Sequence, residues 1–347
     1  MRSQIRTAQV VALAAALTVP LVLGACSSTK SGGSASVGGG GGDLKIGLVT
    51  KTDSNPYFVS MRDAAKAEAE KRGAKLVSAA GTADGDNDSQ VTAIQNMIAS
   101  GVKAILITPN DSTAIVPTLE AAQKKGIFVA ALDTQTDGNK GVDATWATDN
   151  TKAGQQQGAY VKAALGGKTP VLAMLDLEPG VTVGDQRHDG FLQGMGLTDS
   201  SPEIAGKQDT NGDQGKGQTA MENLLQKNSG INSVYTINEP AAIGAATALK
   251  NAGKADSVVL GSIDGGCAGV TAVKNGQIAA TVMQFPGKMA VDGVDAAVAF
   301  AKDGTKPTVP SSGYIDTGVQ LITDKPLAGL DAKDTAWGLQ NCWGGKG

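Results

Sequence analysis

Residues 44–61 read LKIGLVTKTDSNPYFVSM, and this stretch decides the fold prediction for the rest of the chain. The apolar run within Leu44–Val49 is typical of a buried strand, and the polar segment Thr50–Asn55 ends it. Pro56 then predicts the start of a helix. A strand, a polar loop and a helix in this order place the loop at the carboxyl end of the strand, where open α/β sheets bind small ligands.

Asn55, Tyr57 and Phe58 stand together in that loop and at the start of the helix. An amide that donates and accepts hydrogen bonds, beside two aromatic rings, suits a sugar, which has hydroxyl edges and C–H faces. The alternative is that Asn55 only caps the helix and that both rings pack in the core. The stretch by itself leaves both interpretations open.

The first 25 residues have the pattern of a secretory signal peptide. Arg2 and Arg6 precede an apolar run, Val10–Leu23, which is shorter than the ~20 apolar residues of a membrane span. The run ends in Leu-Gly-Ala-Cys at 23–26, which resembles the bacterial lipoprotein signal. That resemblance implies that Cys26 is lipidated and becomes the mature amino terminus. We therefore expect an extracytoplasmic protein, anchored to the outer face of the cytoplasmic membrane.

Residues 26–42 follow as a tether that consists mostly of Ser and Gly. A glycine run cradles phosphate only between a strand and a helix start, and here a strand follows instead, so a phosphate loop is excluded. The chain from Asp43 is long enough for two lobes with sizeable cores. The net charge of -3, without a Lys/Arg cluster, predicts no nucleic-acid partner.

Beyond Met61 apolar runs alternate with amphipathic stretches, which predicts parallel sheets with helices on both faces. The expected helices of the first half are Met61–Arg72, Ser89–Ser100 and Thr113–Lys125. Its further strands are Lys75–Ala79, Ala104–Thr108 and Ile127–Leu132. A second series starts at about Asn150, with strands at Val171–Leu175, Glu203–Gln208, Ser233–Ile237, Val258–Ile263 and Ala279–Met283. The predicted fold class is α/β, with two Rossmann-like lobes facing each other across a ligand cleft.

Seven short motifs, in order, carry a family resemblance over residues 43 to about 323. They are Asn55-Pro56-Tyr57-Phe58, Ala104–Pro109, Ala131-Leu132-Asp133, Arg187–Phe191, Ile237-Asn238-Glu239, Ile263-Asp264-Gly265 and Val282-Met283-Gln284. With them the chain resembles the ribose/galactose/fructose-type solute-binding proteins of bacterial ABC importers, which have the type I periplasmic-binding-protein fold. The resemblance implies three chain crossings, near Thr148, Phe285 and Gly318. The lobes would then be 43–148 with 285–318, and 149–284 with 319–347.

The resemblance also implies a set of sugar-binding residues, whose side chains suit hydroxyl groups. Carboxylates accept from adjacent hydroxyls, a guanidinium donates several parallel hydrogen bonds, and amides do both. Opposite charges in a closed cleft offset one another's desolvation, so the charged members form one set. The alternative for each residue alone is a helix cap or a surface ion pair. The expected set is Asn55, Tyr57, Phe58, Asp133, Arg187, Asn238, Asp264 and Gln284.

Two departures from the ribose-binding pattern bear on the ligand. Thr134 follows Asp133 where the ribose-binding proteins have arginine, and the loop 209–215 lacks their second stacking phenylalanine. The Asp133-Thr134 pair looks closest to the fructose-binding branch, so we expect a fructose-like hexose, a pentose or a small polyol. Trp146 supplies a further ring or packs at the hinge.

The sequence predicts no cofactor and no metal. The acidic loops 84–88 and 209–215 place oxygens on alternate residues, but both lack the glycine and glutamate of a calcium loop. With Cys26 lipidated, Cys267 and Cys342 remain as a pair in an oxidising compartment, which predicts a disulfide between the tail and the loop after Asp264.

We expect a monomeric binding protein that delivers its sugar to an ABC permease, not an enzyme. His188 is the one histidine, and no nucleophile elbow accompanies it. Two alternatives stay open: an exported sugar-cleaving enzyme that uses Asp133 and Asp264 as a carboxylate pair, and a sensor that feeds a membrane receptor. A sugar-responsive repressor would need an amino-terminal helix-turn-helix, where this chain has the lipoprotein-like signal.

Overall fold

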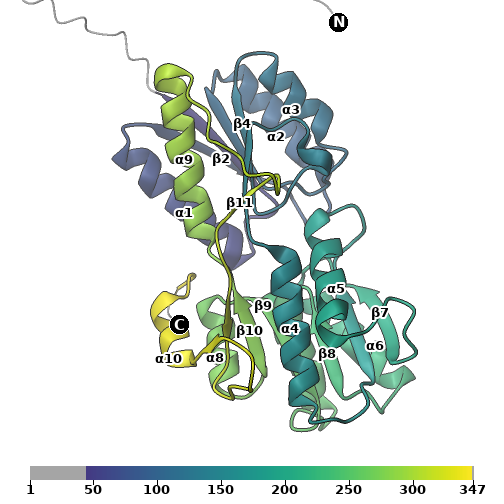
Figure 1. Ribbon diagram of the computed structural model, residues 1–347. Helices are drawn as coiled ribbons and strands as arrows, with labels where there is room; N and C mark the ends of the chain where they lie inside the picture. Colours follow the sequence, from purple (N-terminus) through teal and green to yellow (C-terminus); the bar gives the residue numbers. More distant parts are fainter. Residues whose placement is uncertain (1–43, 346–347) are drawn as a thin grey trace, which may run out of the picture. The chain divides into compact units, whose positions relative to one another are not determined.

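The computed structural model describes residues 44–345, which lie in one compact unit of the chain. The expected signal peptide, the lipidated Cys26 and the tether lie outside these residues. Two sheets, each with helices on both faces, make up the described part (Figure 1). The alternation of strands and helices predicts this α/β architecture, and the structure confirms it.

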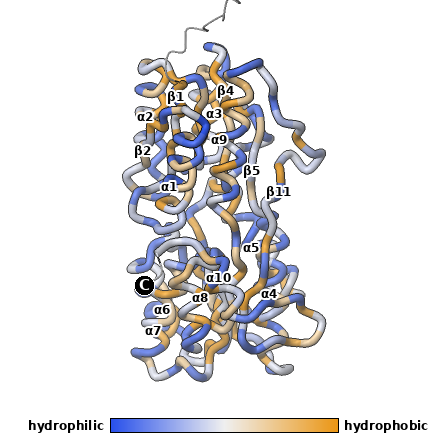
Figure 2. The backbone as a smooth tube through the Cα atoms, turned by 90° about the vertical axis from the view of Figure 1, so that its left-hand side faces the viewer, coloured by the Kyte–Doolittle hydropathy of each residue, from blue (hydrophilic) through white to orange (hydrophobic). Residues whose placement is uncertain are grey.

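The first sheet has six strands, and all its neighbouring strands are parallel. In spatial order they are β11 (Ile315–Asp316), β5 (Ala144–Ala147), β4 (Phe128–Leu132), β3 (Ala104–Ile107), β1 (Lys45–Thr50) and β2 (Lys75–Ala80). Successive side chains of a strand point to opposite faces. In β1, Ile46 and Leu48 pack in the core on one face, whereas Val49 packs in the core on the other. The predominance of hydrophobic residues along β1 and β4 is visible in Figure 2.

The helices of this layer divide between the two faces of the sheet. One face is covered by α1 (Pro56–Lys71) and α9 (Pro286–Asp303), which lie side by side (Figure 1). The other is covered by α2 (Asn87–Ala99) and α3 (Val116–Gln123), and a short 3₁₀ turn, η1 (Asp137–Asn139), follows β4. As predicted, Pro56 begins α1, because its fixed φ and missing N–H suit the first helical position.

The second sheet has seven strands. In spatial order they are β13 (Ala332–Lys333), β12 (Gln320–Ile322), β10 (Ala280–Met283), β9 (Val259–Asp264), β8 (Ser233–Thr236), β6 (Leu172–Asp176) and β7 (Ile204–Asp209). Only the pair β10–β12 is antiparallel among the pairs of this sheet in residues 44–345. Its helices are α4 (Asn150–Ala164), α5 (Thr182–Met195), α6 (Gln214–Lys227), α7 (Glu239–Asn251), α8 (Cys267–Lys274) and α10 (Thr335–Asn341).

Helices α4 and α5 approach each other unusually closely through glycines. A Cβ atom added at Gly190 would overlap the backbone oxygen of Thr151, and one added at Gly154 would overlap that of Arg187. The two backbones therefore touch where any larger residue would hold them apart. This contact fixes the position of α5, which carries Arg187.

The chain passes between the two sheets three times. Strands β1–β5 belong to the first sheet, β6–β10 to the second, β11 to the first again, and β12 and β13 to the second. The predicted strands match the observed ones to within a residue or so at each end, while the short strands β5, β11, β12 and β13 were not predicted. Trp146 lies buried in β5 and packs in the core, which agrees with the packing interpretation of this ring. In the part of the chain that the structure describes, no helix is long and apolar enough to cross a membrane.

Candidate functional site

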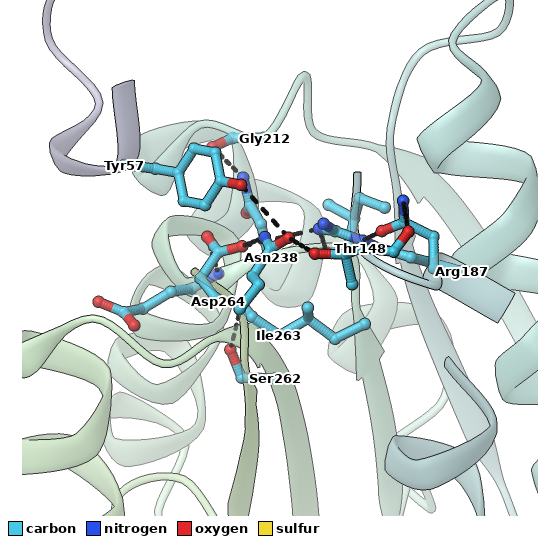
Figure 3. A network of polar contacts seen from close by, with 12 residues as sticks. Tyr57, Thr148, Arg187, Gly212, Asn238, Ser262, Ile263 and Asp264 are labelled. Atoms are coloured by element: carbon cyan, nitrogen blue, oxygen red, sulfur yellow. Dashed lines mark hydrogen bonds and ion pairs between the residues drawn. The ribbon is translucent and has the colours of Figure 1, made fainter. Parts of the chain in front are cut away.

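Segments at the carboxyl ends of strands from both sheets line a small cavity of about 40 Å³, which we call the central cavity. Parallel strands bring their carboxyl ends to the same edge of a sheet, so residues far apart in sequence meet there. Figure 3 shows part of the resulting polar network. All eight residues of the expected sugar-binding set line this cavity: Asn55, Tyr57, Phe58, Asp133, Arg187, Asn238, Asp264 and Gln284.

Residues at the start of α1 both cap the helix and line the cavity. The Asn55 Oδ1 atom accepts a hydrogen bond from the Tyr57 backbone N–H at 2.9 Å, so Asn55 is a helix cap. The rings of Tyr57 and Phe58 are buried and meet edge to face, with their centroids 5.3 Å apart. The two interpretations of this stretch therefore do not exclude each other.

Asp133 follows β4 with a strained backbone and a carboxylate that already accepts two hydrogen bonds. Its φ of 67° lies in a region that residues other than glycine rarely adopt. Oδ1 accepts from the Tyr57 hydroxyl at 2.8 Å, and Oδ2 accepts from Thr134 Oγ1 at 3.0 Å. A carboxylate has about four acceptor positions, so Asp133 keeps capacity for hydroxyl groups of a ligand.

Arg187 and Asp264 form a buried pair of opposite charge. Arg187 Nη1 lies 3.6 Å from Asp264 Oδ1, and only about 4% of each side chain is exposed. Arg187 also donates through Nε to Asn150 Oδ1 at 2.8 Å and through Nη1 to the Ile237 carbonyl at 2.9 Å. These bonds fix the plane of the guanidinium, which leaves its remaining N–H groups oriented for a further acceptor.

Gln284 connects the pair to the first sheet. Its Nε2 donates to Asp264 Oδ1 at 2.7 Å, and its Oε1 accepts from Thr148 Oγ1 at 2.8 Å. The Tyr57 hydroxyl also lies 3.4 Å from this Oε1 atom. Because Thr148 and Gln284 stand at two of the passages between the sheets, the network joins the site to the segments where the sheets are connected.

Asn238 and Glu239 tie the start of α7 to its surroundings. Asn238 Oδ1 accepts from the Ala241 N–H at 3.1 Å, and its Nδ2 donates to the Gly212 carbonyl at 3.0 Å. The buried Glu239 carboxylate accepts from the Gly266 N–H at 2.8 Å, just before α8. Asn238 is thus a cap, like Asn55, and it also lines the central cavity.

Five further residues line the central cavity that the sequence did not predict: Lys51, Asp84, Leu177, Val183 and Ile237. Lys51 directly follows β1, and its Nζ lies 3.8 Å from Asp84 Oδ1. The signal for Lys51 was its place after the first strand, and Asp84 stood only in a loop considered for calcium. By contrast, His188 is not among the lining residues, and its ring pairs with Asp176 at 2.7 Å and Asp199 at 2.8 Å.

Burial raises the pKa of several acids around the site. Desolvation raises the pKa of Asp264 to about 6, although Arg187 and Gln284 favour its charged form. Desolvation likewise raises the pKa of Asp84 to about 6 against the attraction of Lys51, and that of Glu239 to about 8 with the help of Asp264. Burial in the fold therefore favours the protonated form of these carboxyl groups.

These raised values predict that the unliganded protein gains stability as the pH falls from 8 to 5. The folded state binds protons more tightly than the unfolded chain at Asp84, Glu239 and Asp264, so stability is lost as the pH rises through about 6 and about 8. Urea unfolding at pH 5, 6.5 and 8 measures this trend. Glu239→Gln should flatten the upper part of the curve, and a stability that rises with pH over this range would contradict the assignment.

The carboxyl-terminal tail lies against the same region through a disulfide. Cys267, at the start of α8, is joined to Cys342, as the sequence analysis expected. The Cys267 N–H donates to the Trp343 carbonyl at 2.9 Å, and Trp343 Nε1 donates to the Gln284 carbonyl at 2.9 Å. The Trp343 ring also meets Tyr57 edge to face at 5.1 Å. The tail is therefore held against both the second sheet and the start of α1.

Comparison with known proteins agrees with this arrangement of sheets and site. Residues 46–306 match a family model described as a periplasmic binding protein domain. The chain belongs to the periplasmic binding proteins. The ribose import binding protein of Bacillus subtilis (strain 168) is 35% identical over 258 residues, which cover 73% of this chain and 81% of that protein. The D-allose-binding periplasmic protein of Escherichia coli (strain K12) is 29% identical over 265 residues, which cover 74% and 84%.

Solved structures of other periplasmic binding proteins have the same fold. A solute-binding protein of Actinobacillus succinogenes 130z with bound D-allose superposes with a TM-score of 0.72 at 31% identity, covering 80% of this chain and 97% of that one. One from Mycobacterium smegmatis with bound glycerol gives a TM-score of 0.75 at 26% identity, covering 88% and 100%. These neighbours confirm the type I fold that the motif order implied.

Proposed function

We propose that this periplasmic binding protein captures a monosaccharide or small polyol in the central cavity and delivers it to the permease of an ABC importer. The observation that carries the proposal is the buried Arg187–Asp264 pair with Gln284 bonded to it, beside Asp133. Together these groups present charged donors and acceptors to an edge of hydroxyl groups. Ligands with such an edge of hydroxyl groups include ribose and D-allose, which appear in the names of the two relatives above. They also include glycerol, which is bound in one of the solved structures.

Capture requires the walls of the cavity to move. About 40 Å³ holds a few water molecules at most, so a sugar enters only when the two layers separate. Hydrogen bonds outside the cavity lining also join the two layers: the Ser112 N–H donates to the Gly180 carbonyl at 3.0 Å, and Gln186 Nε2 donates to Gln135 Oε1 at 2.9 Å. We infer a hinged opening and closing in which the ligand favours the closed form, because contacts with both layers exist only there.

The finer features of the proposal rest on the sequence. The protein is a monomeric lipoprotein without a cofactor, whose lobes are 43–148 with 285–318 and 149–284 with 319–347. Cys26 carries the lipid, and the Ser/Gly tether lets the protein search the membrane surface for its permease. Fructose stays among the candidate ligands because Thr134 follows Asp133.

A thermal-shift screen of the purified protein tests the proposal. The panel contains D-ribose, D-allose, D-fructose, D-arabinose, myo-inositol and glycerol, with two amino acids as negative controls. A ligand that binds only the folded state raises the unfolding midpoint by mass action, and the expected result is a shift with at least one sugar or polyol and no product on incubation. No shift across the panel would overturn the monosaccharide site, and a product would identify an enzyme.

A further inference from the structure

A second and larger cavity opens directly beside the central one. Its volume is about 510 Å³, within the range of ligand pockets, whereas the central cavity is far smaller. The two cavities share Asn55, Asp84 and Asp264 in their linings, so they adjoin each other. We call the larger part the tail chamber, because Trp343 of the carboxyl-terminal tail lines it.

The indole of Trp343 is a fixed aromatic wall of this chamber. The disulfide at Cys342 anchors the preceding residue, and the Trp343 carbonyl and Nε1 are both engaged in hydrogen bonds of 2.9 Å. The ring is half-buried and meets the Tyr57 ring edge to face. An aromatic ring held in place in this way binds another ring with little further loss of side-chain freedom.

Polar groups from the turn before α6 and from its first residues line the chamber as well. Asn211 has a φ of 49°, so its turn is held in a conformation that favours glycine. Asp213 caps α6 by accepting from the Lys216 N–H at 2.9 Å. An amide, a carboxylate and an ammonium group together provide both donors and acceptors for the edge of a ring.

We propose that the tail chamber binds a second ring attached to the sugar, so that the preferred ligand is a ring-bearing glycoside. The inference rests on the proposed function, since the sugar itself occupies the central cavity. The attached ring lies against Trp343 and directs its polar edge to Asn211, Asp213 and Lys216. Two sources have this chemistry, a second sugar ring and a planar heterocycle, and the experiment distinguishes them.

Titration calorimetry with the purified protein tests the inference on matched probes. D-ribose and methyl β-D-ribofuranoside lack the second ring, adenosine carries a heterocycle on the same sugar, and sucrose and lactose carry a second sugar ring. We expect one ring-bearing class to bind about tenfold or more tightly than the ring-free probes, the scale of one stacking contact. Trp343→Ala should remove this gain, measured as the ratio of the affinities for ring-bearing and ring-free probes in the same variant.

Two further variants separate a ligand contact from a structural effect. Trp343→Phe keeps a ring and should retain part of the gain, even if Trp343→Ala weakens the fold. Trp337→Ala removes the same residue type from α10 of the same tail, outside the chamber lining, and should change neither class of probe. If ring-free sugars bind and ring-bearing probes bind no better, or if Trp343→Ala leaves the gain intact, the second-ring site is wrong while the proposed function stands. If neither these probes nor any compound of the thermal-shift panel binds, both are overturned.

Discussion

Asp264→Ala is expected to abolish sugar binding while leaving the thermal midpoint of the unliganded protein nearly unchanged. The carboxylate accepts from Gln284 Nε2 at 2.7 Å and from the Glu239 N–H at 3.2 Å, and it balances the charge of Arg187. Its loss removes a ligand acceptor and lets Gln284 turn away. Truncating one partner of a buried, hydrogen-bonded charge pair costs roughly 2–5 kcal/mol of binding, which is a loss of at least about 30-fold in affinity.

The thermal midpoint of unliganded Asp264→Ala should stay close to that of the unaltered protein because two effects oppose each other. Removing Asp264 leaves Arg187 without its acid, but it also removes a carboxyl group whose pKa burial raises to about 6. Calorimetry with the best ligand of the screen measures affinity, and thermal unfolding measures stability. Asp209→Ala, at the exposed end of β7 and outside both cavities, is the matched control and should bind normally.

Two outcomes would contradict this assignment. A ligand affinity within about threefold of the unaltered protein, less than 1 kcal/mol, would remove Asp264 from the binding set. A collapse of the thermal midpoint would show that Asp264 is a structural residue. Asp264→Asn keeps the shape of the side chain, so a large loss of affinity in this variant as well would assign the effect to the charge.

Gly190→Ala is expected to lower the free energy of unfolding by about 3 kcal/mol, the upper end for overpacking. The new Cβ would overlap the Thr151 backbone oxygen, and backbone yields less readily than the end of a flexible side chain. Because α5 also carries Arg187, which donates to Asn150 on α4, we expect weaker sugar binding in the fraction that remains folded.

Urea unfolding of Gly190→Ala beside Gly287→Ala makes this comparison controlled. A Cβ at Gly287, in the first turn of α9, would lie 3.7 Å from the Ala64 Cβ, which is an ordinary contact. Gly287→Ala should therefore leave stability unchanged or raise it by about 0.5–1 kcal/mol, because alanine favours helix. Equal free energies of unfolding for the two variants would show that α4 and α5 can move apart without destabilising the protein.

Much of the fold was predictable because local chemistry sets it. The apolar run of β1, the helix start at Pro56 and the alternation of strands with helices depend on residues near each other in the chain. The site positions at the carboxyl ends of β4, β9 and β10 were predictable for the same reason, since strand ends locate the binding edge of a parallel sheet. The short strand β5 was missed because its run of four residues, ATWA, is too brief to show a period.

Local residue preferences along the chain are enough to set the α/β class, the order of the elements and the residues that stand at the strand ends. Tertiary structure alone decided which of those residues meet. The Tyr57 hydroxyl donates to Asp133, which is 76 positions away in the sequence, and lies close to Gln284, which is 227 positions away. Lys51 and Asp84 form an ion pair between two loops, and Trp343 of the tail lines the adjoining tail chamber. The reason is that helix and strand preferences act over a few residues, whereas a side chain's distant partners depend on how whole layers pack.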